Sequence, residues 1–161
     1  MEAKYLIELS KEFFEMAYRL QMDGKYDDAI ELYKKSLDYY PTAEGYTFMG
    51  WAMSALGDYE KAIEECKNAI ELNPDYGNPY NDIGAYLISL ERYEEAIAWL
   101  ELALKASKYA NREFAHYNLG VVYEKIGLWF EALAEYKKAF KVSPRYGNAR
   151  KNYFRLQAQL N

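Results

Sequence analysis

Cysteine and histidine are almost absent from this sequence of 161 residues, which has one of each, Cys66 and His116. A lone cysteine cannot form an internal disulfide, which fits a reducing compartment, so we expect a cytoplasmic protein. One histidine and one cysteine are too few for a recognisable zinc site or a nucleophile–base pair. A glycine-rich phosphate loop is also missing. We therefore expect no metal, no cofactor and no enzymatic activity.

Long apolar runs are missing as well. No stretch approaches the roughly 18 apolar residues that a membrane-spanning helix needs. The first twenty residues include Glu2, Glu8, Glu12 and Glu15, which do not fit the basic start and apolar run of a signal peptide. Hydrophobic residues make up 51% and charged residues 28% of the chain, as in ordinary globular proteins. The sequence predicts one soluble domain, residues 1–161, with no membrane partner.

Acidic residues are missing from the C-terminal end. Glu135 is the last acid, and seven lysines and arginines follow it. Because the whole chain has a net charge of −5, residues 1–135 have a net charge of −12 and the remaining residues +7. Such an asymmetry bears on partners and encounter rather than on fold. We take as a candidate docking surface the basic end formed by Lys141, Arg145, Arg150, Lys151 and Arg155.

A repeated alanine is the most informative feature that is present. It recurs at intervals of 33, 34 and 36 residues, at Ala29, Ala62, Ala96 and Ala132. An aromatic residue stands three positions before each one, at Tyr26, Tyr59, Tyr93 and Trp129. Strand-like alternation is absent, and the apolar spacing is helical throughout. Self-similarity at this period predicts a solenoid of repeated helical units.

The second repeat shows the structure of one unit. Apolar and small residues at helical spacing predict one helix over 43–56 and a second within 57–74. Gly57-Asp58 lies between them and suits a tight turn, because glycine adopts positive φ without penalty. Asn73-Pro74 ends the second helix, since proline disfavours the helical conformation of the residue before it.

This unit resembles the tetratricopeptide repeat. The second repeat matches the family pattern at Tyr46, Met49, Gly50, Met53, Gly57, Tyr59, Ala62, Cys66, Ala69 and Pro74. The fourth matches at His116, Leu119, Gly120, Tyr123, Gly127, Trp129, Ala132, Tyr136, Ala139 and Pro144. The resemblance implies an all-α, right-handed superhelical solenoid with units at about 10–42, 43–76, 77–112 and 113–146. Residues 147–160 are expected to form a capping helix.

The third unit departs from the pattern twice. Glu91 replaces the turn glycine, and Lys108 stands where the proline belongs. The second helix of this unit therefore either runs on or ends in an irregular turn across Ser107–Arg112. Cys66 and His116 occupy packing positions of their units, so we expect a buried, inert thiol and a histidine that serves packing.

In repeats of this family the first helix of each unit lines a concave groove. Large aromatic residues fall on that face at positions that packing within a unit does not need: Phe14, Tyr18, Trp51, Phe114 and Tyr117. One interpretation makes them anchor pockets for apolar side chains of a partner. The other has them pack sideways against the neighbouring first helix.

Asparagines follow on the C-terminal half of the same face. Asn81, Asn118 and Asn152 are predicted to bond to the backbone of a bound peptide, because an amide side chain both donates and accepts. Asn78 and Asn148 lie near helix starts and are interpreted as N-caps.

Some family members hold acidic chaperone tails with a clamp of two basic residues and two asparagines. Asn118 matches that clamp, whereas Asn81, Ala85, Asn148 and Asn152 do not. Binding of such tails is therefore not expected.

The function predicted first is a scaffold or adaptor that binds a protein or peptide in the groove without catalysis. A secretion-type chaperone for one dedicated substrate is the alternative. A third possibility is electrostatic docking through the basic end, with nucleic acid a less favoured partner because surface aromatics do not interleave the charges. Tyr5, Leu6 and Leu9 precede the first unit and either cover its open edge or mediate a homodimer.

Overall fold

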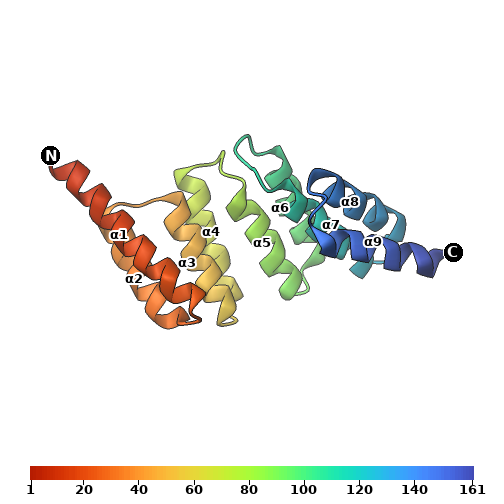
Figure 1. The fold of residues 1–161 in the computed structure, drawn as a ribbon, viewed down its shortest axis with the longest axis horizontal. Helices are drawn as coiled ribbons and strands as arrows, with labels where there is room; N and C mark the ends of the chain where they lie inside the picture. The colour runs from red at the N-terminus through yellow and green to blue at the C-terminus, as the bar shows by residue number, and fades with distance from the viewer.

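The computed structural model describes the whole chain, residues 1–161, as nine α-helices without a strand, which confirms the all-α prediction. The helices are α1 (Glu2–Met22), α2 (Tyr26–Tyr39), α3 (Ala43–Ala55), α4 (Tyr59–Leu72), α5 (Asn78–Ser89), α6 (Tyr93–Lys105), α7 (Arg112–Lys125), α8 (Trp129–Val142) and α9 (Gly147–Leu160). They follow one another along an elongated solenoid with the two termini at opposite ends (Figure 1). None of the helices is long and apolar enough to cross a membrane.

Each helix packs against the next one along the chain, so α1–α2, α3–α4, α5–α6 and α7–α8 form pairs. The first helices of neighbouring pairs also touch, since α1 contacts α3, α3 contacts α5 and α5 contacts α7. This second set of contacts places α1, α3, α5 and α7 along one side of the solenoid. Residues that lie far apart in sequence meet on that side.

The repeated alanines mark where helices approach most closely. Ala29, Ala62, Ala96 and Ala132 are all fully buried. Gly84 and Gly120 lie against Leu100 and Tyr136, where an added β-carbon would stand 2.5 Å from the nearest side-chain atom. Such a contact is too close for any side chain, so a small residue is required at these crossings.

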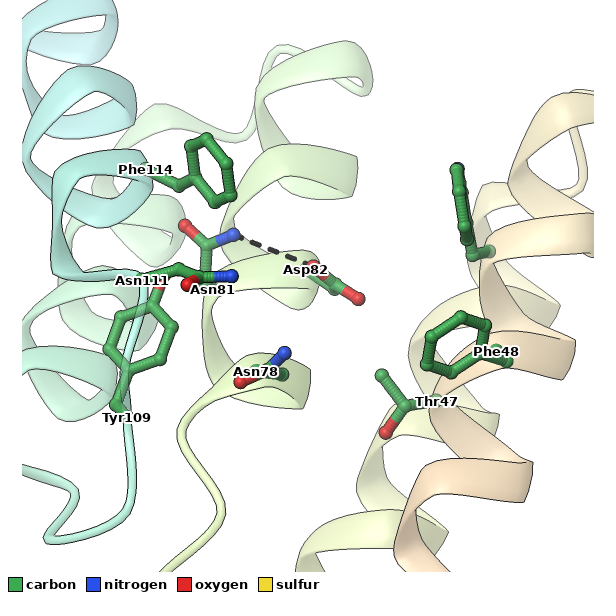
Figure 2. A pocket seen from close by; sticks show the side chains of 9 residues that line it. Thr47, Phe48, Asn78, Asn81, Asp82, Tyr109, Asn111 and Phe114 are labelled. Carbon is green, nitrogen blue, oxygen red and sulfur yellow. Dashed lines mark hydrogen bonds between the residues drawn. The ribbon is translucent and has the colours of Figure 1, made fainter. Parts of the chain in front are cut away.

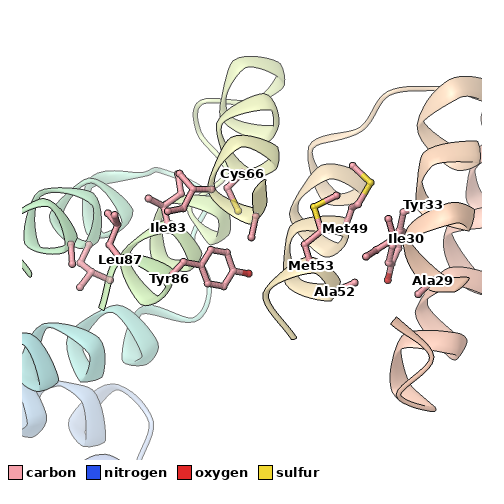
Figure 3. Close-up of a cluster of buried hydrophobic side chains, with 14 of the residues drawn as sticks. Ala29, Ile30, Tyr33, Met49, Ala52, Met53, Cys66, Ile83, Tyr86 and Leu87 are labelled. Carbon is pink, nitrogen blue, oxygen red and sulfur yellow. The ribbon is translucent and has the colours of Figure 1, made fainter. Parts of the chain in front are cut away.

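Larger apolar residues fill the space around the small ones. The main core runs from α1 to α7 and includes Met49, Met53, Ile83 and Leu87 (Figure 3). Cys66 is fully buried in this core, as expected, and burial raises the pKa of its thiol well above the ordinary value.

The tight turns inside the units share one backbone conformation. Gly24, Gly57 and Gly127 take positive φ values of 76°, 84° and 82°, and Glu91 takes 57° at the equivalent place in the third unit. The change from glycine to glutamate therefore leaves the turn geometry in place. It puts a residue with a β-carbon in the left-handed region, which costs about 1–2 kcal/mol.

The loop after α6 shows how the third unit ends without the proline of the other units. The helix ends at Lys105 and does not run on. The loop pairs with the preceding interhelical loop: the Gly77 N–H donates to the Lys108 carbonyl (3.0 Å), and the Lys108 N–H donates to the Asp75 carbonyl (2.9 Å). The Arg112 guanidinium donates to the carbonyls of Leu104 and Ala106, which satisfies the C-terminal end of α6.

Helix α9 covers the last unit. Ala149 and Leu156 are buried against α8, whereas Phe154 is half exposed, with the Arg150 guanidinium 5.8 Å from its ring centroid. The N-cap interpretation of two asparagines is wrong. Asn78 is already the first residue of α5, after Gly77, and Asn148 lies inside α9, after Tyr146 as the cap.

Candidate protein-binding groove

An open cavity of about 360 Å³ lies where three first helices meet, and we call it the central cavity. Helix α3 supplies one wall and α5 the other, with the α6–α7 loop and the start of α7 beside α5 (Figure 2). The lining combines aromatic rings with amide and hydroxyl groups and a single carboxylate, from Thr47, Phe48, Trp51, Asn78, Asn81, Asp82, Tyr109, Asn111 and Phe114.

Helical spacing explains how α3 and α5 present these side chains. Thr47 and Trp51 are four residues apart on α3, and Asn78 stands three and four residues before Asn81 and Asp82 on α5, so each set shares a helix face. The structure brings together at this cavity three of the predicted groove residues, Trp51, Asn81 and Phe114. Their binding role stays a prediction.

The sequence prediction did not include Phe48, Asp82, Tyr109 and Asn111, which also line the cavity. Phe48 and Asp82 are the sequence neighbours of predicted positions, on the broad inner face of their helices. Tyr109 and Asn111 come from the irregular loop, for which repeat spacing carries no signal. The charged residue of α5 was the one sequence clue, because every other residue of that helix is uncharged.

Aromatic side chains form a continuous row across α1 and α3. Phe48 contacts Phe14, Tyr18 and Trp51 edge to face, with ring centroids 5.3, 5.8 and 5.8 Å apart. Tyr18 and Trp51 nonetheless keep 40% and 44% of their surface exposed. The predicted aromatics therefore pack sideways through Phe48 and also present free ring surface, so the two interpretations of these residues are compatible.

A second group of aromatics lies around α7. Tyr146 contacts both Phe114 and Tyr117, at centroid distances of 5.3 and 5.2 Å, and Tyr117 also contacts Tyr136 at 5.8 Å. Phe114 remains 38% exposed and faces the central cavity. Tyr117 is half-buried and lies at the next hollow toward the C-terminus.

The predicted asparagines are already hydrogen-bonded within the protein. The Asn118 amide donates to the Asn81 side-chain oxygen (3.0 Å), the Asn81 amide donates to the Asp82 carboxylate (3.4 Å), and the Asn152 amide donates to the Tyr117 hydroxyl (3.3 Å). Asn81 is also buried. Each amide keeps a second N–H, and Asn118 keeps its carbonyl oxygen, so part of the bonding capacity is free for a ligand.

Asp82 is the charged group of the central cavity. Its carboxylate points from α5 across the cavity toward α3, and no lysine or arginine pairs with it (Figure 2). Burial raises the pKa of Asp82 to about 7, and the hydrogen bond from Asn81 opposes the shift only in part. The carboxyl therefore titrates near neutral pH, unlike an ordinary surface aspartate.

The hollow beside α9 is the other polar part of this face, with a volume of about 500 Å³. Glu124 accepts hydrogen bonds there from the Tyr136 hydroxyl and from the Arg155 guanidinium, both at 2.8 Å. Burial alone would raise the pKa of Glu124, but these two hydrogen bonds outweigh it and lower the pKa. Arg155 is thus paired inside the groove and is not a free charge of the basic end.

His116 makes a specific bond beyond packing. Its Nδ1 atom lies 2.6 Å from the Glu135 carboxylate, which also pairs with Lys138 at 2.8 Å. Burial would raise the pKa of Glu135, and the bonds from His116 and Lys138 reverse that shift and lower it. The contact between His116 and Glu135 joins α7 to α8.

No three histidine, cysteine, aspartate or glutamate side chains are grouped so that they could hold a metal ion.

The fold and the groove define an α-helical repeat scaffold of the kind that binds other proteins. Models of the tetratricopeptide repeat match residues 13–43, 43–76, 78–109 and 113–146. The chain belongs to the tetratricopeptide repeat family, whose members are generally protein-interaction scaffolds.

The chain matches only part of the length of individual relatives. The chain is 39% identical over 82 residues to the "Protein SGT1 homolog" of Oryza sativa subsp. japonica, covering 50% of this chain and 22% of that protein. It is 31% identical over 122 residues to the TPR repeat-containing protein MJ1428 of Methanocaldococcus jannaschii, covering 75% of this chain and 21% of that protein. The chain thus spans about a fifth of the length of these relatives.

A solved structure shows the same fold at low sequence identity. The PilF protein of Pseudomonas aeruginosa superposes with a TM-score of 0.87 and 20% identity, over 94% of this chain and 69% of that one. A match at this identity bears on the fold alone.

Proposed function

We propose that this protein is an adaptor that binds a segment of a partner protein along α3, α5 and α7. The central cavity carries this proposal, because it lies where the first helices of three units meet and offers exposed rings beside amide side chains. The rings suit apolar side chains of a ligand. The amides suit the backbone of an extended chain.

Two tryptophans of similar exposure provide the test. Trp51 lines the central cavity and is 44% exposed, whereas Trp129 begins α8, outside the cavity, and is 50% exposed. A library of random linear peptides displayed on phage supplies ligands without knowledge of the partner. Selected peptides are expected to bind Trp51→Ala about 30-fold more weakly, the effect of losing a hot-spot aromatic, and Trp129→Ala like the wild type.

Equal binding to the wild type and to Trp51→Ala, with both proteins folded by circular dichroism, would contradict the groove proposal. A secretion-type chaperone for one dedicated substrate would use the same groove. That function predicts a single ligand segment in place of a family of selected peptides.

The cytoplasmic location and the homodimer stay predictions. The prediction of the compartment rests on one buried, unpaired cysteine.

Docking through the basic end is the second candidate. Lys141, Arg145, Arg150 and Lys151 are exposed on α8, the following loop and α9. Binding to an acidic partner or a nucleic acid there would weaken steeply as salt rises, because such contacts release counter-ions. A salt titration separates this mode from groove binding, which depends on buried apolar contacts.

A further inference from the structure

We propose that the central cavity receives a lysine or arginine side chain of the bound segment, with Asp82 as its counter-ion. This inference rests on the proposed groove function and names the chemistry that the groove selects. The occupant is thus a basic segment of a partner protein. It is the opposite of the acidic chaperone tails that some members of the family hold.

The first observation is a carboxylate with no cation inside the protein. Asp82 makes one hydrogen bond, the long one from Asn81, and takes part in no salt bridge. It is half-buried, so the carboxylate opens to the cavity and is not sealed in the core. A buried charge without a partner lowers stability, so its position at the centre of a binding surface points to a ligand that supplies the missing charge.

The surroundings of Asp82 contain no internal substitute for that ligand. The ionisable groups that sense its charge are Cys66 from α4, Tyr76 from the α4–α5 loop, Tyr86 from α5 and Tyr109 from the α6–α7 loop. Burial raises the pKa of each, so all four are neutral near pH 7. The α3 wall presents only uncharged side chains to the cavity.

The second observation is a neutral, buried phenol in the same wall. Tyr109 lines the cavity and is only 5% exposed, and no other side chain bonds to its hydroxyl, although a backbone hydrogen bond from Ala115 opposes part of the rise in its pKa. Tyr109 and Asn111 lie beside Asn81 on the wall that carries Asp82 (Figure 2). The Asp82 carboxylate can accept N–H donors, of which a lysine ammonium has three and an arginine guanidinium five.

The opposite wall suits the same cation. Phe48 and Trp51 contact each other on α3, and Asp82 points across the cavity toward that helix (Figure 2). A cation near an aromatic face is attracted by the ring quadrupole, and tryptophan gives the strongest attraction. The methylene groups of lysine and arginine also pack well on such rings.

Charge complementarity extends over the rest of the chain. Residues 1–135 carry a net charge of −12, and residues 136–161 carry a net charge of +7. The field of residues 1–135 therefore favours the approach of a basic segment and disfavours an acidic one.

The experiment uses the full chain and random linear peptides displayed on phage. Peptides selected on the wild type are expected to share a lysine or arginine, and norleucine in its place should weaken binding about tenfold or more in calorimetric titrations. Asp82→Asn should weaken the basic peptide by a similar factor. The matched control is Asp75→Asn, whose exposed side chain lies outside the central cavity and whose loss should leave binding unchanged.

Two results would overturn the inference while leaving the proposed function in place. The first is that the selected peptides are not enriched in lysine or arginine. The second is that Asp82→Asn binds the peptides as tightly as the wild type does, while Trp51→Ala still weakens their binding. Peptides that require neither Trp51 nor Asp82 would instead remove the groove function itself. Asp82→Asn relieves an unpaired carboxylate, so it should fold, and a thermal melt checks this.

Discussion

Gly77 and Tyr109 lie in direct contact where the α4–α5 and α6–α7 loops meet, and a β-carbon on Gly77 would overlap the Cβ and ring of Tyr109. The same two loops share the backbone hydrogen bonds of Gly77 and Lys108. This contact holds Tyr109 in the wall of the central cavity. The shape of the cavity therefore depends on a glycine that does not line it.

Gly77→Ala tests this contact. The added methyl group would overlap the Cβ atom of Tyr109, which a rotation of the side chain cannot move away. The two loops must therefore separate, which lowers the unfolding free energy by about 1–3 kcal/mol. The variant should also lose peptide affinity, because Tyr109 moves. Urea denaturation measures the first effect. Gly147→Ala is the control, since an added β-carbon there meets nothing within 4 Å and should leave stability unchanged or slightly raised.

Glu91→Gly should stabilise the protein. Glu91 has a φ of 57°, in the region where glycine has no steric penalty, and three other units place glycine at this turn. Relief of the strain exceeds the added chain entropy, and we expect a gain of about 0.5–1 kcal/mol in thermal or urea unfolding. The reciprocal change, Gly57→Ala, should lower stability by about the same amount. A lower stability for Glu91→Gly would show that the glutamate side chain holds the turn.

Phe48→Ala should loosen α1 from α3. Phe48 is the ring through which Phe14, Tyr18 and Trp51 are connected, and its truncation removes all three aromatic contacts. We expect a loss of about 2–4 kcal/mol of unfolding free energy. Phe130 is 75% exposed at the start of α8, so Phe130→Ala gives the matched control with little change. Similar stability losses in the two variants would contradict the role of Phe48.

Asp82 should make stability depend on pH in an unusual direction. Its pKa rises from 3.8 to about 7 on folding, so between these values the folded protein holds a proton that the unfolded chain releases. The contribution of this group to the unfolding free energy therefore falls as pH rises from about 4 to about 7. Asp82→Asn should be more stable than the wild type at pH 8, by about 1–2 kcal/mol, with the difference shrinking toward pH 4. Parallel pH profiles of the two proteins in urea denaturation would refute the assignment.

The helices and their pairing could be read from the sequence because they depend on local spacing. The alanine frame marks closest approach, and the burial of Ala29, Ala62, Ala96 and Ala132 confirms it. The turn at Glu91 could not be read in the same way. It keeps the glycine conformation because the packed helices on both sides fix the backbone there, at the expense of local strain.

The candidate site was predictable only where it follows the repeat. Trp51, Asn81 and Phe114 occupy inner positions of first helices, and all three line the central cavity. The prediction did not find that Asn81 and Asn118 bond to each other, because that contact joins two units. It also grouped Arg155 with the free charges of the basic end. The Arg155 guanidinium instead pairs with Glu124, and that contact between α9 and α7 forms only in the folded protein.

The sequence by itself determined a solenoid of helical units and which side chains share the inner face of the first helices, since both follow from a periodic arrangement of small and large residues along the chain. The tertiary structure alone decided what that face offers. Asp82, Tyr109 and Phe48 become neighbours only when α3, α5 and the α6–α7 loop pack together. Such packing removes part of the water around the Asp82 carboxylate and leaves it without a counter-ion, and no spacing rule along one helix records that loss.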